Sequence, residues 1–130
     1  MATLKLCQAD GFYQELNEKN ATLQTQVSAA AQAAGIPFLT HHLGGMFGWF
    51  FTEQTHITNE TCVQRSDLAS FPAFFHAMLK QGIYLAPSPF EAGFISQAHT
   101  QQDIDRTTAA FAKAISTVQK NLSEQDSVTC

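Results

Sequence analysis

Two short β-prone runs that flank Gly44-Gly45 constrain the fold more than any other feature of this sequence. They comprise residues 38–43 and 46–52, and a pair of glycines between such runs predicts two strands joined by a tight turn. The second run, Met46-Phe-Gly-Trp-Phe-Phe51, is nearly all aromatic, which favours coverage of both of its faces. We therefore expect a hairpin with other elements packed around it.

Helical periodicity appears on both sides of this hairpin. An amphipathic helix is predicted from Phe12 to Ala34, and Gly35-Ile-Pro37 ends it. A middle helix begins after an N-cap at Ser66-Asp67 and ends before Gly82; its Pro72 is tolerated near the helix start. The apolar stripes of these two helices are Phe12, Leu16, Leu23, Val27, Ala30 and Ala34, and then Leu68, Phe71, Phe74, Phe75, Met78 and Leu79.

A closing helix is predicted from Thr100, which forms a capping-box pattern with Asp103. Its apolar stripe is Ile104, Phe111, Ile115, Val118 and Leu122. Residues 123–130 are expected to form a flexible tail. Residues 53–65 are polar without a clear period, which predicts a surface connection that has at most a turn of helix.

Two further short strands are predicted, at residues 83–85 and 92–96, joined by a proline-containing loop. The resulting order is α-β-β-α-β-β-α. This order predicts one α+β domain over residues 1–130, with a small antiparallel or mixed sheet of about four strands and helices packed on it. The composition, 45% hydrophobic and 14% charged, suits a single core.

Charge and hydropathy exclude several functions. The net charge is −4, and no Lys/Arg cluster is present to bind nucleic acid or an anionic membrane surface. No apolar run approaches the roughly 20 residues that span a bilayer, and no signal peptide is evident, so we expect a cytoplasmic protein. Cys7, Cys62 and Cys130 lack metal-ligand or redox spacing and are interpreted as reduced thiols.

No motif in the chain indicates a metal or nucleophile site. His41 and His42 are neighbours on a predicted strand and therefore point to opposite faces, which disfavours a shared metal ion. His76 and His99 lack partners at ligand spacing and are interpreted as structural. Gly44-Gly45 lacks the lysine and helix N-terminus of a phosphate-binding loop, and Gly-x-Ser-x-Gly is absent.

The loop Pro87-Ser-Pro-Phe-Glu-Ala-Gly-Phe94 holds the strongest candidate residue. Glu91 lies between Phe90 and Ala92-Gly93-Phe94, so its carboxylate either packs against apolar surface, where a charge requires a partner, or lies in water at a loop tip. Residue types alone leave both interpretations open, and burial with a shifted pKa would favour a functional role.

The sequence resembles the C-terminal part of the glutamate-1-semialdehyde 2,1-aminomutase family, within the class III aminotransferases that depend on pyridoxal 5'-phosphate (PLP). The resemblance extends from about Leu6 to Val118. The matching motifs, in order, are Gly11-Phe-Tyr13, Ala33-Ala-Gly-Ile-Pro37, Gly45-Met-Phe-Gly48, Phe50-Phe-Thr52, Phe74-Phe-His-Ala-Met-Leu79, Gly82-Ile-Tyr-Leu-Ala-Pro-Ser88, Phe90-Glu-Ala-Gly-Phe94, and Ser96–Thr100 with Asp103-Ile-Asp105.

The resemblance implies a fold-type I enzyme that converts glutamate-1-semialdehyde to 5-aminolevulinate for tetrapyrrole synthesis as a cytoplasmic homodimer. It also implies that only the small C-terminal domain is present. The Schiff-base lysine and the cofactor-binding residues of the family belong to the large domain, and none corresponds to a lysine here: Lys5, Lys19, Lys80, Lys113 and Lys120. We therefore expect this chain to be inactive and to bind no PLP or metal by itself, and we interpret Met1-Ala2 as an added start.

Within this resemblance, Glu91 corresponds to a glutamate at the mouth of the family's active site. Gly45, where serine is common, and Pro89, where a less rigid residue is usual, depart from the family pattern. Two alternatives remain: the C-terminal domain of another class III PLP aminotransferase, and an independent α+β binding module that uses its aromatic strand as a partner surface.

Overall fold

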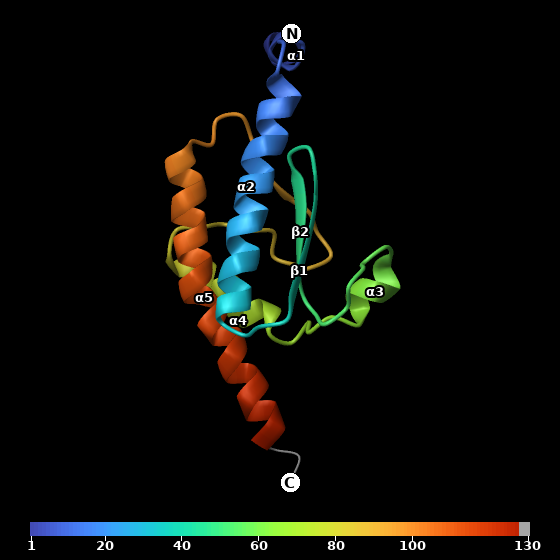
Figure 1. Ribbon diagram of the computed structural model, residues 1–130, viewed down its shortest axis with the longest axis vertical. Helices are drawn as coiled ribbons and strands as arrows, with labels where there is room; N and C mark the ends of the chain where they lie inside the picture. The colour runs from blue at the N-terminus through green and yellow to red at the C-terminus, as the bar shows by residue number, and fades with distance from the viewer. Residues whose placement is uncertain (128–130) are drawn as a thin grey trace.

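The computed structural model describes residues 1–127, with side chains through Val118. The elements, in chain order, are α1 (Ala2–Cys7), α2 (Phe12–Ala33), β1 (Phe38–Leu43), β2 (Met46–Phe51), α3 (Glu60–Gln64), α4 (Phe71–Lys80), β3 (Gly93–Phe94) and α5 (Gln101–Ser127). Helix α2 packs on α5 and β1, and α4 packs on α5, so the helices form a layer beside the hairpin (Figure 1). None of the described helices is long and apolar enough to span a membrane.

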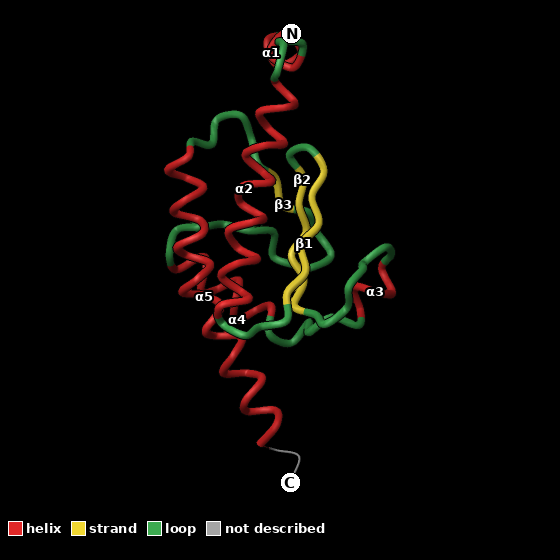
Figure 2. The backbone as a smooth tube through the Cα atoms, in the orientation of Figure 1, coloured by secondary structure: helices red, strands yellow, loops and turns green. Residues whose placement is uncertain are grey.

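The sheet is antiparallel with strand order β1-β2-β3 (Figure 2). The predicted tight turn is confirmed: Gly44 has φ 55°, a backbone conformation that glycine adopts without steric cost. Strand β3 is much shorter than the predicted run 92–96, but Ile95 extends the pairing by donating its N–H to the Gly45 carbonyl at 2.7 Å.

The α+β class is confirmed, but the prediction of a strand at residues 83–85 is wrong, so the described sheet has three strands. The Ile83 N–H bonds back to the Met78 carbonyl at 3.1 Å, and no neighbouring strand pairs with this segment. Ile83 and Leu85 still pack on the core while Tyr84 is exposed. Alternating burial thus arises here without a strand.

The helix predictions hold with shifted ends. Helix α4 begins at Phe71 because the Asp67 carboxylate accepts the Ser70 N–H at 3.1 Å and holds the preceding residues in a turn. The capping box of α5 is confirmed, since the Asp103 carboxylate accepts the Thr100 N–H at 2.7 Å. Helix α5 continues to Ser127, beyond the expected end at Leu122, and 128–130 lie outside the described residues.

The core is an aromatic cluster between the helices and the inner face of β2. Trp49 and Phe111 meet edge to face at 5.2 Å between ring centroids, and Phe74 contacts Phe51 at 5.0 Å and Phe111 at 5.4 Å. Burial alternates along β2, with Phe47, Trp49 and Phe51 buried. The prediction that both faces of this strand are covered is met in full on one face only: on the other, Gly48 and Phe50 are half-buried and Met46 is exposed.

Asn20 and Gln24, one helical turn apart on α2, fasten the hairpin to the helix layer. The buried Asn20 amide donates to the carbonyls of Gly44 at 2.9 Å and Met46 at 2.8 Å, and it accepts from the Gln24 amide at 2.7 Å. The Gln24 Oε1 accepts from the Thr40 hydroxyl at 2.6 Å and the Trp49 indole N–H at 2.7 Å. This network fixes the position of the hairpin, since each buried polar group in it has a partner.

Candidate functional site

The loop of residues 87–94 folds into a defined turn that ends in the sheet. The Ser88 hydroxyl accepts the Phe90 N–H at 3.2 Å, and the Ser88 carbonyl accepts the Glu91 N–H at 3.1 Å. Gly93 then pairs with Phe47 in β2. The loop therefore approaches the hairpin at a fixed register.

The Phe47 ring closely approaches Gly93. A Cβ atom added to Gly93 would overlap the far edge of that ring, which would have to shift. The glycine of the Phe-Glu-Ala-Gly-Phe motif thus lets the loop lie directly against an aromatic ring of β2, one residue from Ala92 and two from Glu91.

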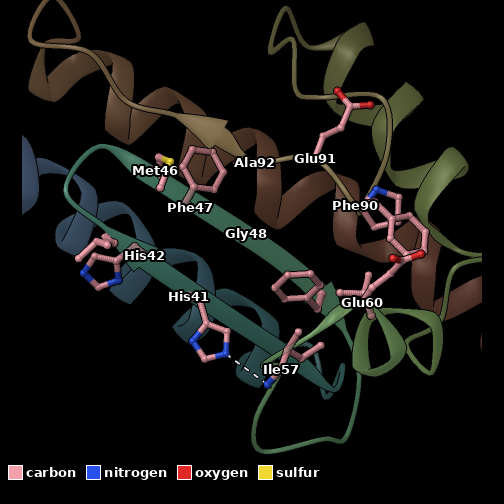
Figure 3. Close-up of a pocket in the computed structure, with 14 residues that line it drawn as sticks. His41, His42, Met46, Phe47, Gly48, Ile57, Glu60, Phe90, Glu91 and Ala92 are labelled. Atoms are coloured by element: carbon pink, nitrogen blue, oxygen red, sulfur yellow. Dashed lines mark hydrogen bonds between the residues drawn. The ribbon is translucent and has the colours of Figure 1, made fainter.

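An open hollow of about 660 Å³ lies between the hairpin, α3 and this loop (Figure 3). The Phe50 ring lies over Gly48, where an added Cβ would be 2.8 Å from it. The hollow is lined by His41, His42, Leu43, Met46, Phe47, Gly48, Phe50, Ile57, Glu60, Val63, Pro89, Phe90, Glu91 and Ala92. Most of this lining is apolar, and the loop of residues 87–94 forms one wall of the hollow.

The ionisable groups of the hollow are two carboxylates, Glu60 and Glu91, and two imidazoles, His41 and His42. His41 Nε2 accepts the Ile57 N–H at 3.4 Å, a long hydrogen bond that connects β1 to the segment before α3. Among the described side chains, residues 1–118, no three His, Cys, Asp or Glu groups come together as a metal site. The lining contains no lysine or arginine, so it offers no permanently charged cation for a cofactor phosphate, and its residues do not fit PLP.

Glu91 is exposed, and its carboxylate points away from β2 (Figure 3). It also lines two smaller hollows on the core side of the loop. The apolar packing weighed for this carboxylate is therefore not seen in the chain by itself, and Glu91 is accessible from several directions.

The lysines with described side chains lie away from the hollow. Lys19 donates to the Gln97 carbonyl at 3.0 Å, while Lys5, Lys80 and Lys113 lie on α1, α4 and α5; none lines the hollow. The side chain of Lys120 lies outside those described.

The remaining candidates have structural surroundings. His99 Nδ1 hydrogen-bonds with the Ser96 N–H at 2.9 Å and hydroxyl at 3.0 Å, so this histidine is hydrogen-bonded as predicted, and His76 packs edge to face on Phe75 at 5.4 Å. Cys7 and Cys62 are free thiols, while Cys130 lies outside the described residues. A backbone hydrogen bond from Thr58 is the main cause that lowers the pKa of Cys62.

Sequence reasoning missed the contribution of α3 to the hollow. The polar segment 53–65 carries no hydrophobic period, yet Ile57, Glu60 and Val63 line the cavity. Asn59 was the available signal: its side chain caps α3 by accepting the Cys62 N–H at 3.1 Å, as asparagine commonly does.

Comparisons with solved structures place this fold among PLP enzymes. A glutamate-1-semialdehyde aminomutase from Pseudomonas aeruginosa PAO1 matches with TM-score 0.72 and 13% identity over 84% of this chain and 24% of its own. A form of the FumI protein from Sphingopyxis sp. MTA144 that carries PLP matches with TM-score 0.71 and 25% identity over 93% of this chain and 26% of its own. At the lower identity the likeness shows the fold alone.

The sequence comparison is more specific, although no family model matches the chain. The glutamate-1-semialdehyde 2,1-aminomutase of Laribacter hongkongensis (strain HLHK9) is 48% identical over 118 residues, which are 91% of this chain and 28% of that relative. The chain thus spans little more than a quarter of the length of the relative it matches. By sequence, most of this chain is therefore similar to a domain-sized part of a glutamate-1-semialdehyde 2,1-aminomutase.

Proposed function

We propose that this chain is the small C-terminal domain of a longer, PLP-dependent aminomutase that converts glutamate-1-semialdehyde to 5-aminolevulinate for tetrapyrrole synthesis. The observation that carries the proposal is the 48% identity over 118 residues to a protein named for that activity. The matched residues make up only 28% of that relative's length, which supports a parent polypeptide longer than this chain. We propose further that this parent is a cytoplasmic homodimer.

In this proposal the rest of the parent polypeptide holds the cofactor. Bound PLP supplies an electron sink for amino-group chemistry, and a cofactor phosphate is usually held by backbone N–H groups and cationic side chains. The hollow has two carboxylates and neither lysine nor arginine among its lining residues. We therefore expect the isolated chain neither to bind PLP specifically nor to catalyse the reaction.

Glu91 is the residue of this chain that we propose contributes to the parent's active site. Its exposed carboxylate is held on a loop whose register is fixed by the pairing of Gly93 with Phe47. A carboxylate there attracts the ammonium group of an amino-acid substrate and repels a misplaced substrate carboxylate, which discriminates between binding orientations.

The function is tested by producing the full-length parent and the 130-residue chain side by side. We expect the parent to bind PLP and to form 5-aminolevulinate without an added amino acceptor, and the isolated chain to do neither. A parent without aminomutase activity, or an isolated chain that binds PLP stoichiometrically, contradicts the proposal.

The role of Glu91 is tested in the same parent with Glu91→Gln. Loss of the charge removes its electrostatic interaction with substrate, so we expect kcat/KM to fall about tenfold or more, corresponding to about 1.4 kcal/mol. The matched control is Glu18→Gln on α2, outside the hollow, which we expect to leave the kinetics unchanged. Unchanged kinetics in Glu91→Gln would remove this residue from the site.

A second candidate is a class III aminotransferase that passes the amino group to a separate acceptor. The fold leaves this candidate open, because a β-phenylalanine aminotransferase from Variovorax paradoxus also matches it, with TM-score 0.67 over 78% of this chain. Turnover without an added keto-acid acceptor distinguishes the two activities, because an aminotransferase requires an external acceptor and an aminomutase does not.

A further inference from the structure

The face of the sheet opposite α2, α4 and α5 is apolar, and the short helix α3 borders part of it across the hollow. Strand β2 buries alternate residues against the helix layer, so its remaining side chains point to the opposite side. We call this side the outer face. Its residues, read from the strand register, are Leu39, His41, Leu43, Met46, Gly48, Phe50 and Phe94.

Three large apolar side chains form a continuous row across the outer face. Leu43 pairs with Met46, and Met46 pairs with Phe94, so directly opposed residues of all three strands project to the same side. Their side chains are 75%, 45% and 66% exposed. Leu43 and Met46 also line the hollow, so the row and the hollow form one surface.

This row is not required to complete the chain's own core. Phe74 and Phe111 are fully buried between the helices and the sheet, and the helix layer is packed without the outer face. Contiguous apolar surface of this kind is unfavourable in water and commonly marks a contact with another protein surface. The charged residues lining the adjoining hollow are both acidic, Glu60 and Glu91.

We propose that the outer face is covered by the rest of the parent polypeptide, with apolar side chains on the row and basic side chains near Glu60 and Glu91. The proposal rests on the parent being longer than this chain, as its 28% share of the relative supports. An inter-domain contact typically buries about 600–1,500 Å², and the row together with the hollow provides a continuous area for it.

The three methionines of the sequence provide a direct test. Met1 is 95% exposed, Met46 is 45% exposed and Met78 is fully buried, and peroxide oxidises methionine according to its exposure. In the isolated chain we expect the oxidation rate of Met46 to lie between those of Met1 and Met78. In the full-length parent we expect Met46 to oxidise at least about tenfold more slowly than in the isolated chain, close to Met78.

Equal oxidation of Met46 in the isolated chain and in the parent overturns the proposal. Protection of Met46 that rises with the concentration of the isolated chain also overturns it, because a second copy would then cover the face. Leu43→Gln should abolish such self-association, whereas Leu4→Gln, which changes an exposed leucine on α1, should not.

This test is independent of the catalytic proposal. PLP binding and 5-aminolevulinate formation are measured separately in the same parent. A parent that neither binds PLP nor forms 5-aminolevulinate, but protects Met46 from oxidation, refutes the proposed activity and supports the proposed interface. An active parent in which Met46 is oxidised as fast as in the isolated chain supports the activity and refutes the interface.

Discussion

Asn20 should stabilise the hairpin more than any exposed hydrogen-bonding residue of α2, and its replacement by alanine tests the polar network directly. The substitution removes two bonds to the carbonyls of Gly44 and Met46 and leaves the Gln24 Nε2 group without its partner. Those two hydrogen bonds lie at a part-buried turn, where water can replace them only in part. Gln24 is buried, so its amide carries the main cost.

A buried polar group left without a partner costs about 1–3 kcal/mol, and alanine recovers roughly 0.5 kcal/mol through its higher helix propensity. With partial loss of the two carbonyl bonds, the net destabilisation expected for Asn20→Ala is about 2 kcal/mol. For a domain of this size that loss lowers Tm by about 6–10 °C.

The assay is urea unfolding followed by the fluorescence of Trp49, the only tryptophan, whose indole N–H bonds to Gln24. The matched control is Gln14→Ala, which removes an exposed hydrogen bond to Glu18 on the same helix and should change the free energy of unfolding by less than about 0.5 kcal/mol. Equal stability of the two variants would refute the reasoning. Asn20→Asp, which keeps the acceptor but adds a buried charge, should be at least as destabilising as alanine at neutral pH.

Three further predictions concern close approaches and a helix cap. Gly45→Ser should destabilise the fold by about 1–3 kcal/mol in chemical unfolding, because an added Cβ lies 2.8 Å from the Ile95 carbonyl oxygen; unchanged stability would show that this strand contact relaxes freely. Gly93→Ala should cost a similar amount and alter the near-UV circular dichroism of the displaced Phe47 ring. Asp103→Asn should flatten the acid side of the stability–pH profile. The Thr100 backbone N–H holds the pKa of Asp103 below its ordinary value of 3.8, so its stabilisation is present above that value and is lost as pH falls through the lowered pKa.

Much of the fold follows from periodicity in the sequence. The bounds predicted for β1 and the start of β2 are correct, and α2 begins at the predicted residue, because each burial pattern there repeats over several turns or pairs. The run at residues 83–85 was predicted as a strand because its side chains alternate between partly buried and exposed. Strand pairing also requires a neighbouring strand, and the sequence of one segment does not show whether such a neighbour is present.

The candidate site was less accessible to sequence reasoning. Asn20 and Gln24 interrupt the apolar stripe of α2 and resemble surface residues until the hairpin carbonyls are placed beside them. The α3 wall of the hollow has no hydrophobic period at all. The hydrophobic pattern of a segment indicates which of its residues face a core. The hydrogen bonds of Asn20 and Gln24 and the α3 wall of the hollow depend instead on which segments come into contact.

The aromatic character of β2 connects the fold to the proposed interface. A strand with Met46, Phe47, Trp49, Phe50 and Phe51 has more apolar side chains than one covered face requires. Burying the outer side chains as well would contribute about 25 cal/mol for each Å² of apolar surface removed from water. The isolated chain meets the prediction of two covered faces only in part, but a parent whose remaining residues pack on the outer face would meet it in full. An aromatic strand that is fully buried on one face, while Met46 is exposed and Phe50 half-buried on the other, therefore supports a partner surface on the outer face.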